Sequence, residues 1–286
     1  MSTIKSLKTP LRYPGGKSRA VSKLFQYIPN LNNHKEYREP FLGGGSVALE
    51  ITKRYPNISI WVNDLYEPLY NFWCELQHNG QDLQDAIWSL KNQHPDRVTA
   101  RELFNKSKVD VNDKEKSNFA RASSFYIVNK CSFSGLTESS SFSAQASDSN
   151  FSIRGIQRLG EYSEIIQSWI ITNHSYERLL TKDWDRKGIF VYMDPPYDIK
   201  IPIYGKRGAM HKHFDHDKFA SDCDEYTSNM LISYNSNQIV RDRFKDWNAA
   251  EFDLTYSMRT VGDYMKEQAD RKELVLMNYD SLKSAH

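Results

Sequence analysis

The stretch Glu39-Pro40-Phe41-Leu42-Gly43-Gly44-Gly45-Ser46-Val47-Ala48 decides the fold, because it joins a strand pattern to a helical pattern through consecutive glycines. Gly43, Gly45 and Ala48 fit the G-x-G-x-x-G/A spacing that brings backbone amides against a nucleotide-containing ligand. Glycine has no Cβ, so the backbone can approach such a ligand closely. The flanking residues predict a strand at 36–40 and a helix from Ser46 to about Arg54.

The next strand pattern, Ile58–Val62, leads to Asp64, which lies 19 residues beyond Gly45. A carboxylate at that place can accept hydrogen bonds from both hydroxyls of a ribose. The spacing therefore predicts an adenosine-containing cofactor, without separating a dinucleotide from S-adenosylmethionine. The competing interpretation of Asp64 is a helix N-cap or a turn residue.

Alternating strand and helix patterns predict an α/β fold with a mixed sheet flanked by helices. Residues 75–165 interrupt this alternation and predict an inserted module, which leaves 1–74 and 166–286 as the catalytic domain. The module is predicted to contain helices at Asp82–Lys91, Thr99–Lys106 and Lys116–Lys130, then a hairpin or long mobile loop at Cys131–Ser152. Further strands are predicted at Trp169–Thr172, Ile189–Met193 and Met230–Tyr234, with an antiparallel closing pair at Glu251–Tyr256 and Leu274–Asn278.

Composition sets wide limits on function. Hydrophobic residues make up 39% of the 286 residues and charged residues 26%, which allows a sizeable core and argues against disorder. The formal net charge of +2 does not by itself indicate a polyanionic partner. The three cysteines are widely separated, which excludes a disulfide framework and a zinc ribbon. The lack of a long apolar stretch or signal peptide predicts a soluble protein of the cytoplasm, without a membrane partner.

The sequence Asp194-Pro195-Pro196-Tyr197 follows the buried-strand pattern Ile189–Met193. Ligands of open α/β sheets bind beyond the carboxyl ends of the strands. An aromatic exocyclic amine is a weak nucleophile, and two acceptors on its N–H bonds direct its lone pair outward; the Asp194 carboxylate and the Pro195 carbonyl can supply both. The prolines keep the turn rigid, and Tyr197 offers a ring for stacking. The alternative is a stiff turn without chemistry.

The segment Leu11-Arg12-Tyr13-Pro14-Gly15-Gly16-Lys17-Ser18 ends like a phosphate-binding loop, but Leu11 stands where that motif requires a glycine. What remains is a double-glycine turn that opens a helix. The helix amides and the Lys17 ammonium together suit a ligand carboxylate. An ordinary surface turn is the alternative.

Taken together, the motifs at 13–17, 40–46 and 194–197 resemble those of Dam-type DNA adenine-N6 methyltransferases, in the same order and over nearly the whole chain. The resemblance implies a Rossmann-like methyltransferase sheet with an inserted helical and β-hairpin DNA-recognition module. It implies methyl transfer from S-adenosylmethionine to N6 of an adenine flipped out of double-stranded DNA, in the setting of restriction–modification. The catalytic residues would be Asp194, Pro195 and Tyr197, and the cofactor residues Tyr13, Gly16, Lys17, Phe41, Gly43, Gly45, Asp64 and Asp194.

The stretch Phe125–Lys130 followed by Phe133–Leu136 resembles the start of that family's DNA-reading hairpin. Candidate DNA contacts are Lys130, Phe133, Ser134, Arg154 and Arg158, with Phe133 as a wedge beside the flipped base. The GATC-methylating members carry an arginine where Glu138 stands here, so an arginine that reads guanine is missing. The target sequence is therefore left open.

Several further expectations accompany this interpretation. The protein is expected to act as a monomer or weak dimer on DNA, in a bacterial or phage-infected cell. The ligand-rich segment 211–217 lacks a defined spacing, so no metal is predicted. The alternatives are a dinucleotide oxidoreductase, a non-catalytic DNA-binding protein on the same fold, and methylation of cytosine N4 or RNA. An oxidoreductase gives no reason for Asp-Pro-Pro-Tyr.

Overall fold

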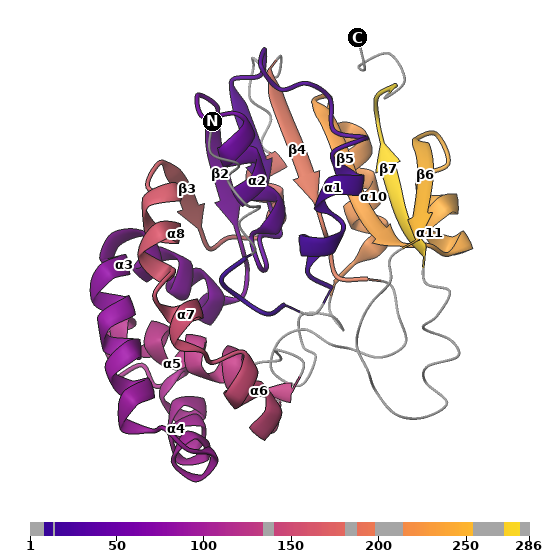
Figure 1. Cartoon of the computed structure of the whole chain (residues 1–286). Helices are drawn as coiled ribbons and strands as arrows, with labels where there is room; N and C mark the ends of the chain where they lie inside the picture. The colour runs from indigo at the N-terminus through magenta and orange to yellow at the C-terminus, as the bar shows by residue number, and fades with distance from the viewer. Residues whose placement is uncertain are drawn as a thin grey trace.

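A seven-stranded mixed sheet forms the body of the molecule in the computed structural model, which describes residues 9–13, 15–133, 140–180, 188–197, 214–253 and 272–280. The strand order is β3-β2-β1-β4-β5-β7-β6, in which β7 runs antiparallel to its two neighbours and the other pairs are parallel (Figure 1). The strands are β1 (Glu36–Glu39), β2 (Ser59–Asn63), β3 (Trp169–Thr172), β4 (Ile189–Met193), β5 (Asn229–Asn235), β6 (Asn248–Asp253) and β7 (Lys272–Met277). The expected α/β class and the antiparallel closing pair are confirmed.

Helices cover both faces of the sheet and build a separate layer beside it (Figure 1). Those packed on the sheet are η1 (Lys17–Arg19), α1 (Val21–Leu24), α2 (Ser46–Arg54), η3 (Tyr176–Leu180), α10 (His216–Glu225) and α11 (Gln238–Arg243). The helical module consists of α3 (Glu67–Gln93), α4 (Arg97–Asp110), α5 (Asn118–Cys131), α6 (Ala144–Ser149), α7 (Ile153–Ile156) and α8 (Leu159–Ile165). No helix in these described ranges combines the length and apolar character needed to cross a membrane.

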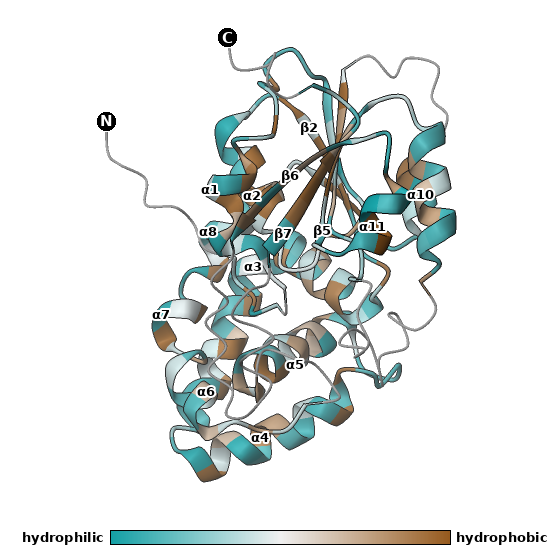
Figure 2. Ribbon diagram, turned by 90° about the vertical axis from the view of Figure 1, so that its right-hand side faces the viewer, coloured by the Kyte–Doolittle hydropathy of each residue, from teal (hydrophilic) through white to brown (hydrophobic). Residues whose placement is uncertain are grey.

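The central strand β4 is buried over its whole length and divides two cores. Because successive side chains of a strand point to opposite faces, Phe190 and Tyr192 join the core beneath α1, α2 and α3. Val191 and Met193 join the core beneath α10 and α11. Strand β7 accordingly appears hydrophobic over most of its length (Figure 2), and the packed sheet supports the residues placed at its edge.

The carboxyl ends of the parallel strands point toward the helical module (Figure 1). Since β7 is antiparallel, its first residues lie at this same edge, and Glu273 pairs in register with Asn235 near the end of β5. The edge that receives Asp194 from β4 therefore also receives Glu273 from β7. This meeting of residues far apart in the sequence shapes the site described below.

Residues Asp82–Lys91 are helical as predicted, but they form the second half of α3 rather than a helix of their own. The helix passes through a single non-helical residue, Asn79, with φ −128° and ψ 31°. Burial of Leu83 and Ile87 stabilises the part of the helix that follows this kink. The adjoining Gly80 is required by packing, since a Cβ there would lie 2.2 Å from the Cβ of Ser163 in α8. The pair Asn79-Gly80 thus marks a close helix–helix contact rather than a loop.

The serine-rich segment Cys131–Ser152 is only partly the predicted hairpin or loop. An antiparallel bridge joins Ser132 to Phe142, as expected for the base of a hairpin. The segment then forms α6, whose N-cap Ser143 accepts a hydrogen bond from the Ala146 amide. Ser152 caps α7 in the same way. Part of the serine content therefore serves helix capping, while Ser134 lies outside the described residues.

Candidate active site

A cleft opens at the carboxyl ends of β1 and β4, beside the glycine turn. It has two parts with volumes of about 60 Å³ and about 450 Å³. Phe41, Asp64 and Pro196 line both parts, so the two are continuous along the sheet edge. The smaller part is also lined by Tyr13, Gly16, Lys17, Glu39, Gly43, Gly45, Tyr192 and Asp194. The structure thus brings together every described residue predicted to bind the cofactor.

The glycine turn depends on residues without a side chain. Gly43 and Gly45 have φ of 50° and 69°, the left-handed region that disfavours other residues. A Cβ on Gly45 would lie 2.8 Å from the ring of Trp73, whose Nε1 donates a hydrogen bond of 3.1 Å to the Gly43 carbonyl. A Cβ on Gly43 would lie 3.1 Å from the ring of Tyr13. The rings of Trp73 and Tyr13 therefore pack against the glycine turn, which lines the cleft.

Gly45→Ala is expected to lower the free energy of unfolding by roughly 2–4 kcal/mol, because the strained φ and the contact with Trp73 add. Chemical denaturation measures this loss. Gly160→Ala is the matched control, since its Cβ would meet only the side-chain ends of Gln81 and Gln84. A loss below about 1 kcal/mol in Gly45→Ala would show that the turn tolerates a side chain.

Asp64 ties the end of β2 to the glycine turn. Its Oδ2 accepts a hydrogen bond of 2.9 Å from the Gly43 amide, and its Oδ1 accepts one of 2.9 Å from the Tyr66 amide. The side chain is buried, and this burial raises the pKa of Asp64 to about 6 in spite of the two amide donors. The turn-residue interpretation is therefore correct for one oxygen, and each oxygen keeps a further lone pair for a ligand.

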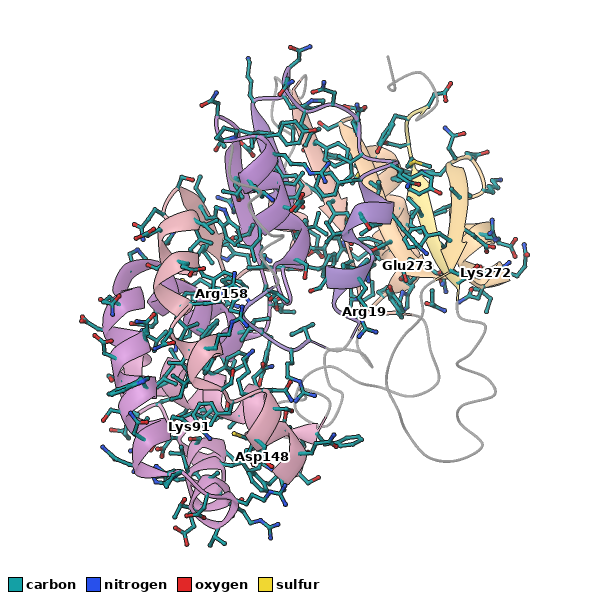
Figure 3. The ribbon with its side chains drawn as sticks, in the orientation of Figure 1. Arg19, Lys91, Asp148, Arg158, Lys272 and Glu273 are labelled. Atoms are coloured by element: carbon teal, nitrogen blue, oxygen red, sulfur yellow. The ribbon has the colours of Figure 1, made fainter. Side chains whose placement is uncertain are left out.

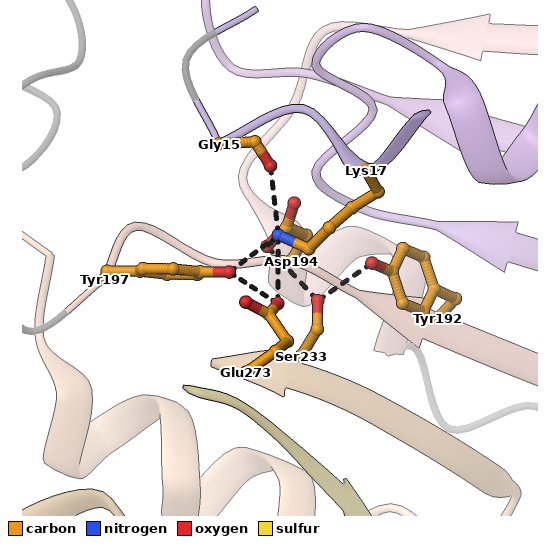
Figure 4. A network of polar contacts seen from close by, with 7 residues as sticks. All are labelled: Gly15, Lys17, Tyr192, Asp194, Tyr197, Ser233 and Glu273. Atoms are coloured by element: carbon orange, nitrogen blue, oxygen red, sulfur yellow. Dashed lines mark hydrogen bonds and ion pairs between the residues drawn. The ribbon is translucent and has the colours of Figure 1, made fainter. Parts of the chain in front are cut away.

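Lys17 begins η1, a single 3-10 turn, and its ammonium points into a polar cluster (Figure 4). Lys17 Nζ lies 2.7 Å from Asp194 Oδ1, 2.6 Å from the Tyr197 hydroxyl and 3.2 Å from Glu273 Oε1. It also donates to the Gly15 carbonyl at 3.2 Å. In this structure Lys17 lines the cleft and also contacts the Asp-Pro-Pro-Tyr motif directly, and its contact with a cofactor stays a prediction.

Asp194 is held by one oxygen and open at the other. Its Oδ1 accepts hydrogen bonds from Lys17 and, at 3.2 Å, from the Ser233 hydroxyl. Within the described ranges, neither Asp194 Oδ2 nor the Pro195 carbonyl oxygen accepts a hydrogen bond. Burial is the main cause that raises the pKa of Asp194 to about 6; Lys17 opposes this rise and Glu273 adds to it.

Tyr197 is fixed at both ends of its side chain. Its ring stacks on Tyr234 with centroids 6.0 Å apart, and its hydroxyl donates a hydrogen bond of 2.6 Å to Glu273 Oε1. The residue is half-buried. The structure therefore presents Tyr197 beside Asp194, as the motif predicted.

Two carboxylates of the site were not predicted. Glu39 lies at the end of β1, is buried, and accepts a hydrogen bond of 2.5 Å from the Tyr37 hydroxyl; burial raises its pKa well above the usual range. Glu273 is only 2% exposed in β7. An acid closing a buried strand was a usable signal for Glu39. Glu273 had no such signal, because its place depends on the register of an antiparallel strand.

The predicted DNA contacts other than Ser134, which lies outside the described residues, differ in their surroundings. Phe133 is 48% exposed, Arg154 is exposed, and Arg158 forms an ion pair of 3.1 Å with Glu161. Lys130 is buried and its ammonium lies 5.2 Å from the centre of the Tyr126 ring. Figure 3 shows Arg158 and Lys91 on the module, with Arg19 and Lys272 at the facing end of the sheet.

Burial is the main cause that lowers the pKa of Lys130 to about 8, and the neighbouring Arg12 lowers it further. Among the residues that the structure describes, no acid pairs with the Lys130 ammonium. Arg12 is anchored nearby: its guanidinium donates a hydrogen bond of 2.8 Å to the Ser132 carbonyl. The base of the hairpin therefore carries two cations without a carboxylate partner in the described part of the chain.

In the parts of the chain that the structure describes, no group of three or more His, Cys, Asp or Glu could hold a metal ion. The segment 211–213, with two of the histidines considered above, lies outside the described residues.

A glycine turn with an acid after the second strand, set beside an Asp-Pro-Pro-Tyr edge, defines an S-adenosylmethionine-dependent methyltransferase that acts on an amine. The family model of the D12 class N6 adenine-specific DNA methyltransferases matches residues 13–258, and the chain belongs to this family. It is an adenine-specific DNA methyltransferase with S-adenosylmethionine as its cofactor. Membership of this family decides between the alternatives for substrate and cofactor considered above: the substrate is adenine in DNA, and the cofactor is not a nicotinamide dinucleotide.

Two relatives of the chain are named as type II methyltransferases. The chain is 25% identical over 202 residues to the type II methyltransferase M.MjaIII of Methanocaldococcus jannaschii, covering 67% of this chain and 69% of the relative. It is 20% identical over 278 residues to the type II methyltransferase M.CviBI of Paramecium bursaria Chlorella virus NC1A, covering 96% and 100%. Among solved structures, an rRNA methyltransferase, aviRa from Streptomyces viridochromogenes, is 10% identical over 98% of this chain and 94% of its own, with a TM-score of 0.35.

Proposed function

We propose that this methyltransferase acts on an adenine flipped out of double-stranded DNA, and that Asp194 and Pro195 hold its amino group. The observation that carries the proposal is that Asp194, which lines the cleft, and the adjoining Pro195 each keep an acceptor, Oδ2 and the carbonyl oxygen, without a hydrogen bond from the described residues. Adenine N6 has two N–H bonds, one for each acceptor. Lys17 and Ser233 occupy the other carboxylate oxygen and so orient the open one.

The cleft suits S-adenosylmethionine, which supplies a methyl group on a sulfonium. Asp64 would accept hydrogen bonds from the ribose hydroxyls, and Gly43 and Gly45 would let the backbone approach. Phe41 and Tyr13 supply rings along the cleft. Lys17 and Gly16 line the same part, with the ammonium acting through Asp194. The buried Asp64 between the two parts of the cleft supports this fit.

The two acceptors address the chemical difficulty of the reaction. The lone pair of adenine N6 is delocalised into the ring, and hydrogen bonds to both N–H groups favour a tetrahedral nitrogen. Asp194 and Pro195 therefore aim the lone pair, and the proline pair keeps that aim fixed. The sulfonium is a good leaving group, so positioning supplies most of the acceleration.

Base flipping follows from the same geometry, because N6 is out of reach while the base is stacked. We propose that Tyr197 stacks on the flipped adenine and that Phe133, which is 48% exposed, fills the gap it leaves. Arg154, Arg158 and Ser134 are proposed as DNA contacts of the module formed by 75–165. The boundary at 75 lies inside α3, so the module and the Rossmann-like catalytic part (1–74 and 166–286) share a continuous core.

Sequencing N6-methyladenine in DNA from an expressing host identifies the target site. A duplex with 2-aminopurine in place of the target adenine is then expected to gain fluorescence when the protein binds. Size measurement of that complex tests the proposed monomer or weak dimer. A single strand methylated as well as the duplex, without a fluorescence change on the duplex, would contradict flipping.

Lys130→Met is expected to raise the free energy of unfolding by about 1–2 kcal/mol at pH 7, because it removes a buried charge. The folded pKa is lowered to about 8, so this gain is complete below pH 8 and shrinks as the pH rises toward the unfolded value. If Lys130 contacts a phosphate, the salt slope of DNA binding falls by about one unit. Lys106→Met, an exposed lysine on α4, is the stability control. An unchanged salt slope would contradict the phosphate contact.

A further inference from the structure

Glu273, near the start of β7, lies at the sheet edge that carries the active site. Its carboxylate has no role in the proposed chemistry. It is 2% exposed, so its charge sits among polar partners rather than in solvent. Such a burial is costly unless the charge is paired and hydrogen-bonded. The pairing it makes is with two residues of the site, Lys17 and Tyr197.

These contacts form a directed chain. Lys17 donates to the Tyr197 hydroxyl oxygen at 2.6 Å, and that hydroxyl donates to Glu273 Oε1 at 2.6 Å. Glu273 Oε1 also lies 3.2 Å from the Lys17 ammonium, which in turn contacts Asp194 Oδ1. The ammonium is therefore shared between two carboxylates (Figure 4).

Sharing the ammonium has a consequence for Asp194. Without the charge of Glu273, the Lys17 ammonium would keep its contacts with the Gly15 carbonyl and the Tyr197 hydroxyl, but it would shift toward Asp194 and there compete with a substrate amine. Glu273 supplies the opposing attraction and keeps Lys17 on Oδ1. The same carboxylate anchors the hydroxyl end of Tyr197, whose other support is the ring of Tyr234.

We infer that Glu273 is a positioning residue for methyl transfer, which holds Lys17 and Tyr197 so that Asp194 keeps one oxygen open for the substrate amine. This inference rests on the proposed roles of Asp194 and Tyr197. It assigns to the start of β7 a function in the reaction, although that strand lies outside the matched residues 13–258.

Glu273→Gln is the first test, because it keeps the shape of the side chain and removes the charge. We expect kcat for methylation of a target duplex to fall roughly 10- to 100-fold, as for loss of one orienting charge, while KM for S-adenosylmethionine stays within about threefold. Glu251→Gln on the adjoining β6, which pairs with Arg241, removes a carboxylate outside the site and is expected to behave as wild type.

The pH profile separates positioning from mere structural support. Charged or titratable groups around Asp194 are Lys17 on η1, Glu273 on β7, Tyr192 on β4 and Glu39 on β1. Glu273 repels the ionised form of Asp194, so its loss lowers the pKa of Asp194. The acid limb of the kcat profile is therefore expected to move to lower pH in Glu273→Gln.

Tyr197→Phe provides the second variant and also decides the case if Glu273→Gln does not fold, as judged by thermal melting. It removes the hydroxyl relay but keeps the ring. We expect a lower kcat than wild type, and a double variant no slower than the slower single one. An unchanged kcat in either folded variant, or a reduced kcat with an unmoved acid limb in Glu273→Gln, overturns the inference. Failure of the wild type to methylate adenine would instead refute the proposed function.

Discussion

Asp194→Ala is expected to reduce kcat for adenine methylation by roughly 10³-fold or more, while S-adenosylmethionine still binds within about tenfold of wild type. The substitution removes the acceptor for one N–H of the substrate and leaves Lys17 without its partner at 2.7 Å. The cofactor keeps Asp64 and the glycine turn. Transfer of labelled methyl groups to target duplex measures the rate, and calorimetry measures cofactor affinity.

Asp148→Ala is the matched control, because this exposed aspartate pairs with Arg97 on the helical module, away from the cleft (Figure 3). It is expected to methylate at the wild-type rate. In the wild type, the rate should also fall as the pH drops through about 6, where Asp194 becomes protonated and loses its acceptor function. Asp194→Ala turnover within tenfold of wild type would contradict the role given to this carboxylate.

Asp64→Ala is expected to weaken S-adenosylmethionine binding by roughly 10²-fold or more, since two hydrogen bonds from ribose hydroxyls to a charged group are lost. The affinity of the wild type should decline below pH 6, because burial raises the pKa of Asp64 to about 6 and only the ionised form accepts both bonds. Calorimetric titration of the cofactor at several pH values measures both effects.

Loss of Asp64 also frees the Gly43 amide, so thermal melting must accompany the titration. Asp64→Asn keeps an acceptor for that amide but turns its NH2 group toward the Tyr66 amide, so it should recover part of the stability and little of the affinity. A dissociation constant within about threefold of wild type in a folded Asp64→Ala protein would place the ribose elsewhere.

The local motifs were sufficient to predict the centre of the site. The glycine turn, Asp64 and the Asp194-Pro195 pair each lie where a strand meets a loop, and the parallel order of β1, β2 and β4 brings them to one edge. Such placement needs only the rule that ligands bind at the carboxyl ends of parallel strands. The cleft residues could therefore be predicted without knowledge of side-chain contacts.

The contacts of Lys17 could not be predicted in the same way. Asp194 is 177 positions away from it in the sequence, and the link to Glu273 depends on how β7 is paired with β5. Register is decided by packing across the whole sheet rather than by a local pattern. The continuation of α3 past Asn79 has a similar origin, because burial of Leu83 and Ile87 stabilises the helix beyond that non-helical residue.

A structure of the protein with target duplex and an inert analogue of the methyl donor tests the central claim most directly. The distances to measure run from N6 of the target adenine to Asp194 Oδ2 and to the Pro195 carbonyl oxygen. The account predicts an extrahelical adenine with both distances in the hydrogen-bond range of about 2.7–3.2 Å. An adenine still stacked in the duplex, or an N6 directed away from both oxygens, would contradict it.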